Sequence, residues 1–315
     1  MEIFNSIITL AFMYLGILTL SSISSIISER VGIVNIGVNG TIVFGATIYM
    51  IFASIFSSRG SFEASSWLQI PLFIISGLAG IAFSSLHGYA TIKLKANQII
   101  SGVAMNILAP AMTLLVLFVF GEAGRMNYNV PELAIGNNAS AEITGIFSLS
   151  SFVMILVVVV SMIMLNKTSW GLRLKSVGEN PQASDAAGIN VNSFKWQGVL
   201  ISGLLAGFAG AMFMASTRTS GNTFQGSVEG LGFLSLAIMI VGRWKIIPSL
   251  FVSVAFSFLL SISYNFTQLV PKDYSNYQFL VLAVPYVVTL IAMVAFAKGS
   301  IGPKAAGIPY DKTLR

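Results

Sequence analysis

The chain has 315 residues, of which 55% are hydrophobic and only 9% charged, and its mean hydropathy is +0.85. Soluble domains carry about 25% charged residues, so the composition excludes an ordinary soluble protein and makes the lipid bilayer the solvent for most of the chain. The absence of cysteine excludes disulfides, thiolate metal sites and cysteine nucleophiles. The net charge of +6 does not call for a nucleic-acid partner, because membrane proteins keep excess Lys and Arg in their cytoplasmic loops.

Nine apolar stretches predict an all-α integral membrane protein with a bundle of about 9–10 transmembrane helices, one or two of them broken or short. The N-terminal residues 1–6 lack the basic region of a secretory signal, so the first stretch is expected to be a retained helix. The seventh stretch is short, and we do not expect it to cross the membrane as one continuous helix. The predicted spans lie near 7–27, 32–56, 68–87, 97–120, 148–166, 194–216, 228–243, 246–268 and 277–297.

This layout predicts a single transmembrane domain over residues 1–315, with a cytoplasmic loop at 167–193 and a tail at 298–315. Thirteen of the 17 Lys and Arg residues then fall on one side, which marks the cytoplasm. They are Arg30, Lys93, Lys95, Lys167, Arg173, Lys175, Lys195, Arg243, Lys245, Lys298, Lys304, Lys312 and Arg315. The other side holds Arg59, Arg125, Arg218 and Lys272. The N-terminus is therefore predicted outside and the C-terminus inside; an extra crossing near 31–40 would raise the number of spans to ten.

The predicted spans lack the groups that ion coupling or catalysis would need. No Asp, Glu, Lys or Arg lies in the middle of any span, and Glu229 comes closest, at the outer edge of the seventh. The one histidine, His87, is expected to be an interfacial residue at a helix end. No catalytic set, metal cluster or GxxxxGK[ST] phosphate loop is present. We therefore expect no enzyme activity, metal or cofactor, and expect a partner to supply the energy for any pumping.

Small and uncharged polar residues occur at membrane depth. Gly203 and Gly207 form a GxxxG pair, and Ala206 and Gly210 repeat the spacing, which predicts close helix packing. The glycine-rich run 32–40 weakens a regular helix and is expected to be buried in protein or to line a wet cavity. Lining of a translocation pathway and plain interhelical hydrogen bonding are both open for the polar residues near these segments. The candidate pathway residues are Asn35, Asn39, Asn97, Gln98, Ser101 and Asn106.

The loop 167–193 carries the signals of a short helix. Asn180 is a good N-cap and Pro181 suits the first helical position. Ala186 and Ala187 favour helix, and Gly188 is placed to end it. The pattern predicts a helix of about two turns over 181–187, which is too short to be stable alone. It is expected to pack on its own protein or in a groove of a separate motor protein.

Three blocks of sequence resemble the permease subunits of ABC importers for simple sugars and nucleosides, the branch with ribose systems and basic-lipoprotein-dependent nucleoside systems. These blocks are residues 29–40, residues 95–106 and residues 171–188, and a weaker fourth joins 230–233 to 242–244. The third, with the core Gly178-Glu179-Asn180-Pro181, is the most specific. Nucleoside-type members commonly have Glu where this chain has Asn39, so the substrate preference does not follow from that position.

The resemblance implies an ABC ATPase subunit, an extracellular or periplasmic substrate-binding (lipo)protein and a second, identical or homologous permease subunit as partners. It also implies that the helix after Asn180 couples to the ATPase. The coupling residues would be Gly178, Glu179, Asn180, Pro181, Ala183, Ala186, Ala187 and Gly188. The expected function is translocation of nucleosides or a simple sugar across the cell membrane. An ion-coupled secondary transporter of a small neutral polar solute is the alternative, disfavoured by the missing intramembrane charges, and a membrane enzyme is disfavoured by the missing catalytic groups.

Overall fold

The structure is a computed structural model that describes residues 2–58, 65–121, 148–216, 226–269, 277–296 and 302–311, together with the single residues 126, 130, 131, 133 and 224. The described part is all helical, as predicted, apart from connecting segments. Its helices are α1 (Glu2–Arg30), α2 (Val38–Ser58), α3 (Gln69–Gly88), α4 (Gln98–Phe120), α5 (Leu149–Lys167), α6 (Ser169–Glu179), α7 (Pro181–Ala186), α8 (Val191–Ala215), α9 (Leu231–Val241), α10 (Ile246–Tyr264), α11 (Phe266–Leu269) and α12 (Gln278–Phe296). A 3₁₀ turn (Ser66–Leu68) precedes α3 and a π-helical turn (Tyr89–Lys93) follows it.

Eight of the described helices are long and apolar enough to cross a membrane, and α9 is a shorter apolar helix. Each of the nine predicted stretches therefore contains a helix. The two predicted irregularities are also present. The second helix begins at Val38 rather than near 32, and the residues before it are not helical. The seventh is only the 11 residues of α9, about 16 Å at 1.5 Å per residue, so it does not span a hydrocarbon core of about 30 Å.

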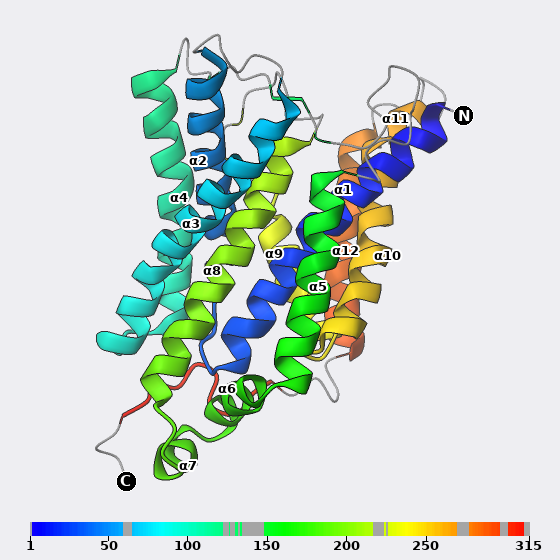
Figure 1. The fold of residues 1–315 in the computed structure, drawn as a ribbon. Helices are drawn as coiled ribbons and strands as arrows, with labels where there is room; N and C mark the ends of the chain where they lie inside the picture. The colour runs from blue at the N-terminus through cyan, green and yellow to red at the C-terminus, as the bar shows by residue number, and fades with distance from the viewer. Residues whose placement is uncertain are drawn as a thin grey trace.

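The core is built around α8, which packs against α1, α2 and α3 (Figure 1). The predicted small-residue stripe makes this possible. A Cβ atom at Gly203 would lie 2.5 Å from the carbonyl oxygen of Gly80, and one at Gly207 would lie 2.3 Å from that of Ser76. The Ser76 hydroxyl donates to the carbonyl oxygens of Gly45 and Gly207, both at 2.8 Å. The prediction of close helix packing is confirmed, and backbone contact joins α2, α3 and α8.

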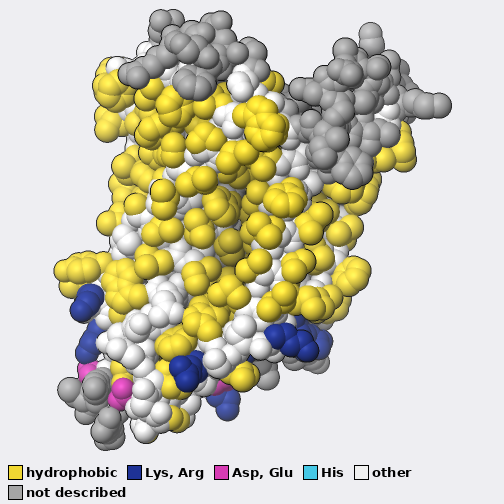
Figure 2. Space-filling view, in the orientation of Figure 1, with side chains coloured by type: hydrophobic (Ala, Val, Ile, Leu, Met, Phe, Trp, Pro, Cys, Tyr) yellow, Lys and Arg dark blue, Asp and Glu magenta, His cyan; other side chains and the backbone are white. Residues whose placement is uncertain are grey.

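The positive charge gathers at the end of the molecule that carries α6 and α7, which we call the α7 end (Figures 1 and 2). All of the described Lys and Arg residues belong to segments at this end, and the apolar surface of Figure 2 lies above them. The four residues counted on the opposite side, and Lys298, Lys312 and Arg315, lie outside the described residues. The side of the membrane on which these seven residues lie stays a prediction.

Candidate functional site

The helix α7 at the tip of the 167–193 loop has the caps that the sequence predicts. It runs from Pro181 to Ala186, and the Asn180 side chain accepts a hydrogen bond from the Ala183 N–H at 2.9 Å. Gly188 has φ +81°, the left-handed conformation that glycine adopts without strain. Its N–H donates to the carbonyl of Asp185, and the next N–H, of Ile189, donates to that of Ser184. Together these bonds form a complete Schellman motif, so both ends of the helix are fixed.

The two faces of α7 differ. Pro181 and Ser184 are buried, and the Ser184 hydroxyl donates to the Asn180 carbonyl at 2.9 Å and to the Ser176 hydroxyl on α6 at 3.2 Å. The opposite face is exposed and mostly made of small residues. It consists of Gln182, Ala183, Ala186, Ala187 and Gly188. The helix is therefore anchored to its own protein on one side and presents a shallow, uncharged surface on the other.

The helix α6, which sequence reasoning did not delimit, anchors this unit to the membrane helices. Its buried face includes Gly171, Leu174 and Gly178, at helical spacing. A Cβ atom at Gly171 would lie 2.3 Å from the Met164 carbonyl oxygen, and one at Gly178 would lie 2.1 Å from the Arg30 carbonyl oxygen. Gly171 and Gly178 of the third sequence block are thus positions where α6 touches the ends of α5 and α1.

The first and fourth sequence blocks meet at the same place. The indole N–H of Trp244 donates to Glu29 Oε2 at 2.7 Å, and the Arg30 guanidinium donates twice to the Trp244 carbonyl, at 3.0 and 3.1 Å. The C-terminal tail returns to this cluster, where the Ala305 N–H donates to the Gly178 carbonyl at 2.9 Å. No sequence signal predicted the return of the tail, because the contact uses only backbone atoms.

The non-helical segment between α1 and α2 is held by side chains of the second block. Gln98 Oε1 accepts from the Val34 N–H at 2.7 Å. Asn106 spans the break, because its amide donates to the Ile36 carbonyl at 3.0 Å and accepts from the Gly40 N–H at 2.7 Å. Backbone groups that a broken helix leaves unsatisfied in a membrane need such partners. The structure therefore gives these two candidates an interhelical hydrogen-bonding role.

The other candidate pathway residues occupy separate positions. Asn97 is the N-cap of α4 and is exposed, whereas Asn35 is buried and its amide reaches the Ser202 hydroxyl at 3.4 Å. Asn39 accepts from the Gly232 N–H at the start of α9, at 3.1 Å. Ser101 faces a ring nitrogen of the histidine described next. None of these contacts tests whether a solute passes here, so pathway lining stays a prediction for all six residues.

The expectation that His87 is an interfacial residue is wrong. The side chain is fully buried, with Nδ1 at 3.0 Å from the Ser101 hydroxyl and Nε2 at 3.2 Å from the Val34 carbonyl oxygen. The helix continues past it as a π-helical turn, and the ring packs against α4 and the segment before α2 instead of facing outward. The sequence placed His87 at a helix end. It gave no sign that the non-helical segment 31–37 would cover the side chain.

A carboxylate that the sequence left aside is ringed by tyrosines. Glu229 Oε2 accepts from the hydroxyls of Tyr264, at 2.5 Å, and Tyr14, at 3.3 Å, and the hydroxyl of Tyr286 donates to the Glu229 carbonyl. Glu229 does precede its helix, as expected, but α9 is only about 16 Å long. The carboxylate lies directly before Gly230, the N-cap residue of α9. Tyrosines on three distant helices gave no pattern that would have predicted this cluster.

The eight long apolar helices, the broken segment and the capped helix at one end describe a helical membrane transport component. A family model for the branched-chain amino acid transport system / permease component matches residues 7–297, and the chain belongs to this family. It is a permease component of an ABC importer, a membrane-spanning subunit that is not itself an enzyme. Permease components of this kind work with an ATPase and a binding protein.

Relatives named as permeases match over most of their length. The nucleoside ABC transporter permease protein NupC of Lactococcus lactis is 38% identical over 94% of this chain and 93% of its own. The guanosine ABC transporter permease protein NupQ of Bacillus subtilis is 34% identical over 100% of this chain and 99% of its own. A solved structure of a metal-chelate type ABC transporter in an inward-facing conformation shares the fold, with a TM-score of 0.50 and 14% identity over 91% of this chain and 84% of that one.

Proposed function

We propose that this permease imports nucleosides. The support is the similarity over nearly the full length to permeases named for nucleoside and guanosine transport. A relative named for glucose transport is 27% identical over 73% of this chain, so a sugar substrate is the weaker reading. An ion-coupled transporter is disfavoured because the full-length relatives are named as permeases of ABC transporters.

We further propose the orientation and the remaining partners. The α7 end would face the cytoplasm, because all of the described cations lie there and positive loops stay inside. That places the N-terminus outside and the C-terminus inside. The binding protein would be extracellular or periplasmic, with a lipid anchor or without one, and a second permease subunit, identical or homologous, would complete the membrane part.

The single observation that carries the coupling role is the exposed alanine face of α7. A short helix is marginal in water, yet this one is capped at both ends and anchored through Ser184. The exposed residues of its outer face carry no charge and, apart from Gln182, are small, which suits insertion into a groove of the ATPase. The anchored face leads through Gly178 to the end of α1, so a push on α7 would reach the membrane helices. We assign the coupling role to residues 178–188.

The test is a charge on the exposed face, Ala187→Glu. Ala187 is exposed and follows the last residue of α7, so the change should leave folding and abundance unaltered. It should abolish the substrate-stimulated ATPase activity of the assembled transporter, because a carboxylate would have to be desolvated in the groove. The matched control is Lys93→Glu, an exposed position at the same end of the molecule, which should retain stimulated activity. Reduced abundance of Ala187→Glu would instead show that the alanine face packs on its own protein, and normal stimulated activity would disprove the coupling role.

A further inference from the structure

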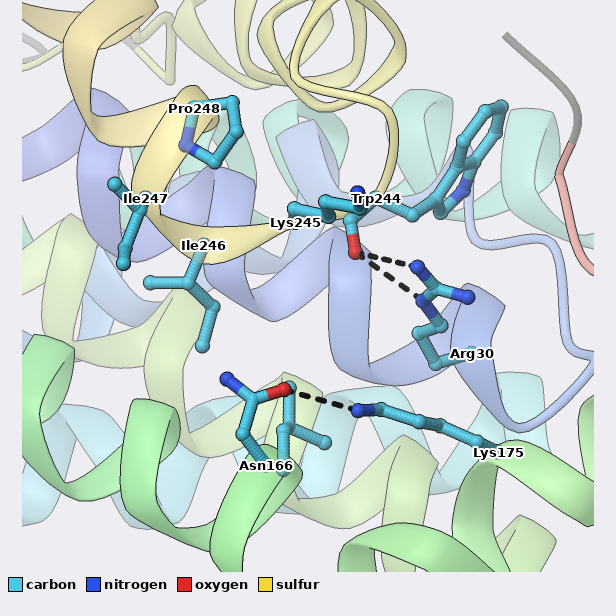
Figure 3. A pocket seen from close by; sticks show the side chains of 9 residues that line it. Arg30, Asn166, Lys175, Trp244, Lys245, Ile246, Ile247 and Pro248 are labelled. Carbon is cyan, nitrogen blue, oxygen red and sulfur yellow. Dashed lines mark hydrogen bonds between the residues drawn. The ribbon is translucent and has the colours of Figure 1, made fainter.

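A pocket of about 310 Å³ opens at the α7 end between the end of α5, the start of α10 and α6 (Figure 3). This volume is at the lower end of the range for small-molecule sites. Its polar lining is cationic and contains no carboxylate. The lining residues are Arg30, Leu165, Asn166, Lys175, Trp244, Lys245, Ile246, Ile247 and Pro248.

Three positive side chains, of Arg30, Lys175 and Lys245, line the pocket without an ion-pair partner in the described part of the chain, where the one ion pair joins Lys95 to Asp311. Hydrogen bonds hold two of them. The Lys175 ammonium donates to Asn166 Oδ1 at 3.0 Å, and Arg30 is held by the Trp244 carbonyl. Partial burial lowers the pKa of Lys175, and the positive charge of Arg30 lowers it further. The smaller part of the shift, which comes from Arg30, reflects repulsion between these two cations, and a bound anion would relieve it.

The start of α10 adds backbone donors. No side chain caps this helix, so the first-turn N–H groups of Ile246 and Ile247 remain as donors at its positive end, and Pro248 has no N–H to offer. Two carboxylates lie nearby but do not line the pocket. Glu29 accepts from the Trp244 indole, and Glu179 attracts Arg30 from α6.

The pocket also adjoins an exposed apolar surface. It lies where two candidate spans, α5 and α10, end. Ile247 is 48% exposed, and Phe251, one turn further along the same face of α10, is 70% exposed. A ligand with an anionic head and an apolar chain would place the head among the cations and the chain along this face. A free anion would contact only the cations and not the apolar face of α10.

We propose that this pocket binds the phosphate of an anionic membrane phospholipid, with Arg30, Lys175 and Lys245 as the cationic ligands and α10 as the rest for an acyl chain. Basic pockets between membrane helices are suited to such headgroups. The bound lipid would bridge Lys175 on α6 and Lys245 at the start of α10. It would thereby connect α6 and α7 to α10.

The test is to titrate the purified full-length transporter in detergent with each probe. Binding is measured by the change in the thermal unfolding midpoint. The probes are short-chain phosphatidylglycerol, short-chain phosphatidylcholine and inorganic phosphate. The wild type should be stabilised by phosphatidylglycerol and not by phosphatidylcholine. The double variant Lys175→Gln, Lys245→Gln should bind phosphatidylglycerol about twenty-five-fold more weakly, since each basic residue near a membrane surface contributes about fivefold. The double arginine variant should bind like the wild type.

The control is Lys93→Gln, which removes an exposed charge from the same end of the molecule but outside the pocket. It should bind phosphatidylglycerol like the wild type. Equal binding by the double glutamine variant and the wild type would overturn the site. Stabilisation by inorganic phosphate at the same concentrations as by phosphatidylglycerol would overturn the lipid as the source of the anion. Unfolding midpoints without any probe, equal in all variants, show that the comparison concerns binding and not folding.

Discussion

The contact between Gly178 and the end of α1 allows a quantitative prediction for Gly178→Ala. The added Cβ would lie 2.1 Å from the Arg30 carbonyl oxygen, whereas ordinary contact begins near 3.4 Å, so α6 must move by about 1 Å. Overpacking of this kind costs about 1–3 kcal/mol. Loss of the Ala305 hydrogen bond to the Gly178 carbonyl adds about 1 kcal/mol. Against this, alanine is favoured over glycine inside a helix by up to about 1 kcal/mol. We expect a net destabilisation of about 1–3 kcal/mol.

The assay is thermal unfolding of the purified transporter together with its substrate-stimulated ATPase activity. Gly178→Ala should lower both the unfolding midpoint and the stimulated activity. The control is Gly188→Ala, where nothing lies within 4 Å of the added carbon and only the φ of +81° resists the change. Its cost of about 1–2 kcal/mol is confined to the end of α7, so the global unfolding midpoint should stay unchanged. A lower midpoint for Gly188→Ala than for Gly178→Ala would refute the argument from backbone contact.

The remaining predictions concern the break, the tyrosine cluster and the orientation. Asn106→Leu should destabilise the fold by about 1–2 kcal/mol in thermal unfolding, because the Ile36 carbonyl and the Gly40 N–H lose their partner; unchanged stability would mean that the amide is dispensable for the break. Glu229→Gln should keep an acceptor for the tyrosine hydroxyls and unfold at a higher temperature than Glu229→Ala, and the reverse order would contradict their role. In the cysteine-free chain, Lys304→Cys should be shielded from an impermeant maleimide in intact cells and labelled after lysis; labelling before lysis would invert the topology.

Local signals explain what the sequence predicted well. Both caps of α7 follow from residue types within a few positions, Asn180 and Gly188, whose preferences act through their own backbone. The glycine-rich run before Val38 likewise revealed a break, and the spacing of Gly203 and Gly207 revealed a packing face.

Contacts between distant segments could not be predicted in the same way. The tail reaches Gly178 through a backbone N–H of Ala305, and Glu229 is bound by tyrosines from helices far apart in the sequence. His87 was misplaced for the same reason, because the segment that buries it comes from another part of the chain. The sequence identified the six polar candidates as a group. It could not show which of them hold the backbone and which could contact a solute, because that depends on the neighbour that each side chain faces.

The seam of glycines between α2, α3 and α8 restricts how the molecule can move. At Gly80, Gly203 and Gly207 backbones touch with no side chain between them, so these helices cannot slide past one another without atoms overlapping. They should travel as one rigid body, together with α1, which packs closely on α8. By contrast, only 11% of the apolar stretch of α12 is buried against the rest of the protein, and only 22% of that of α4 and of α5. Alternating access in this permease would then be a rocking of the block against its peripheral helices and against the proposed second permease subunit, with the hinge outside the seam.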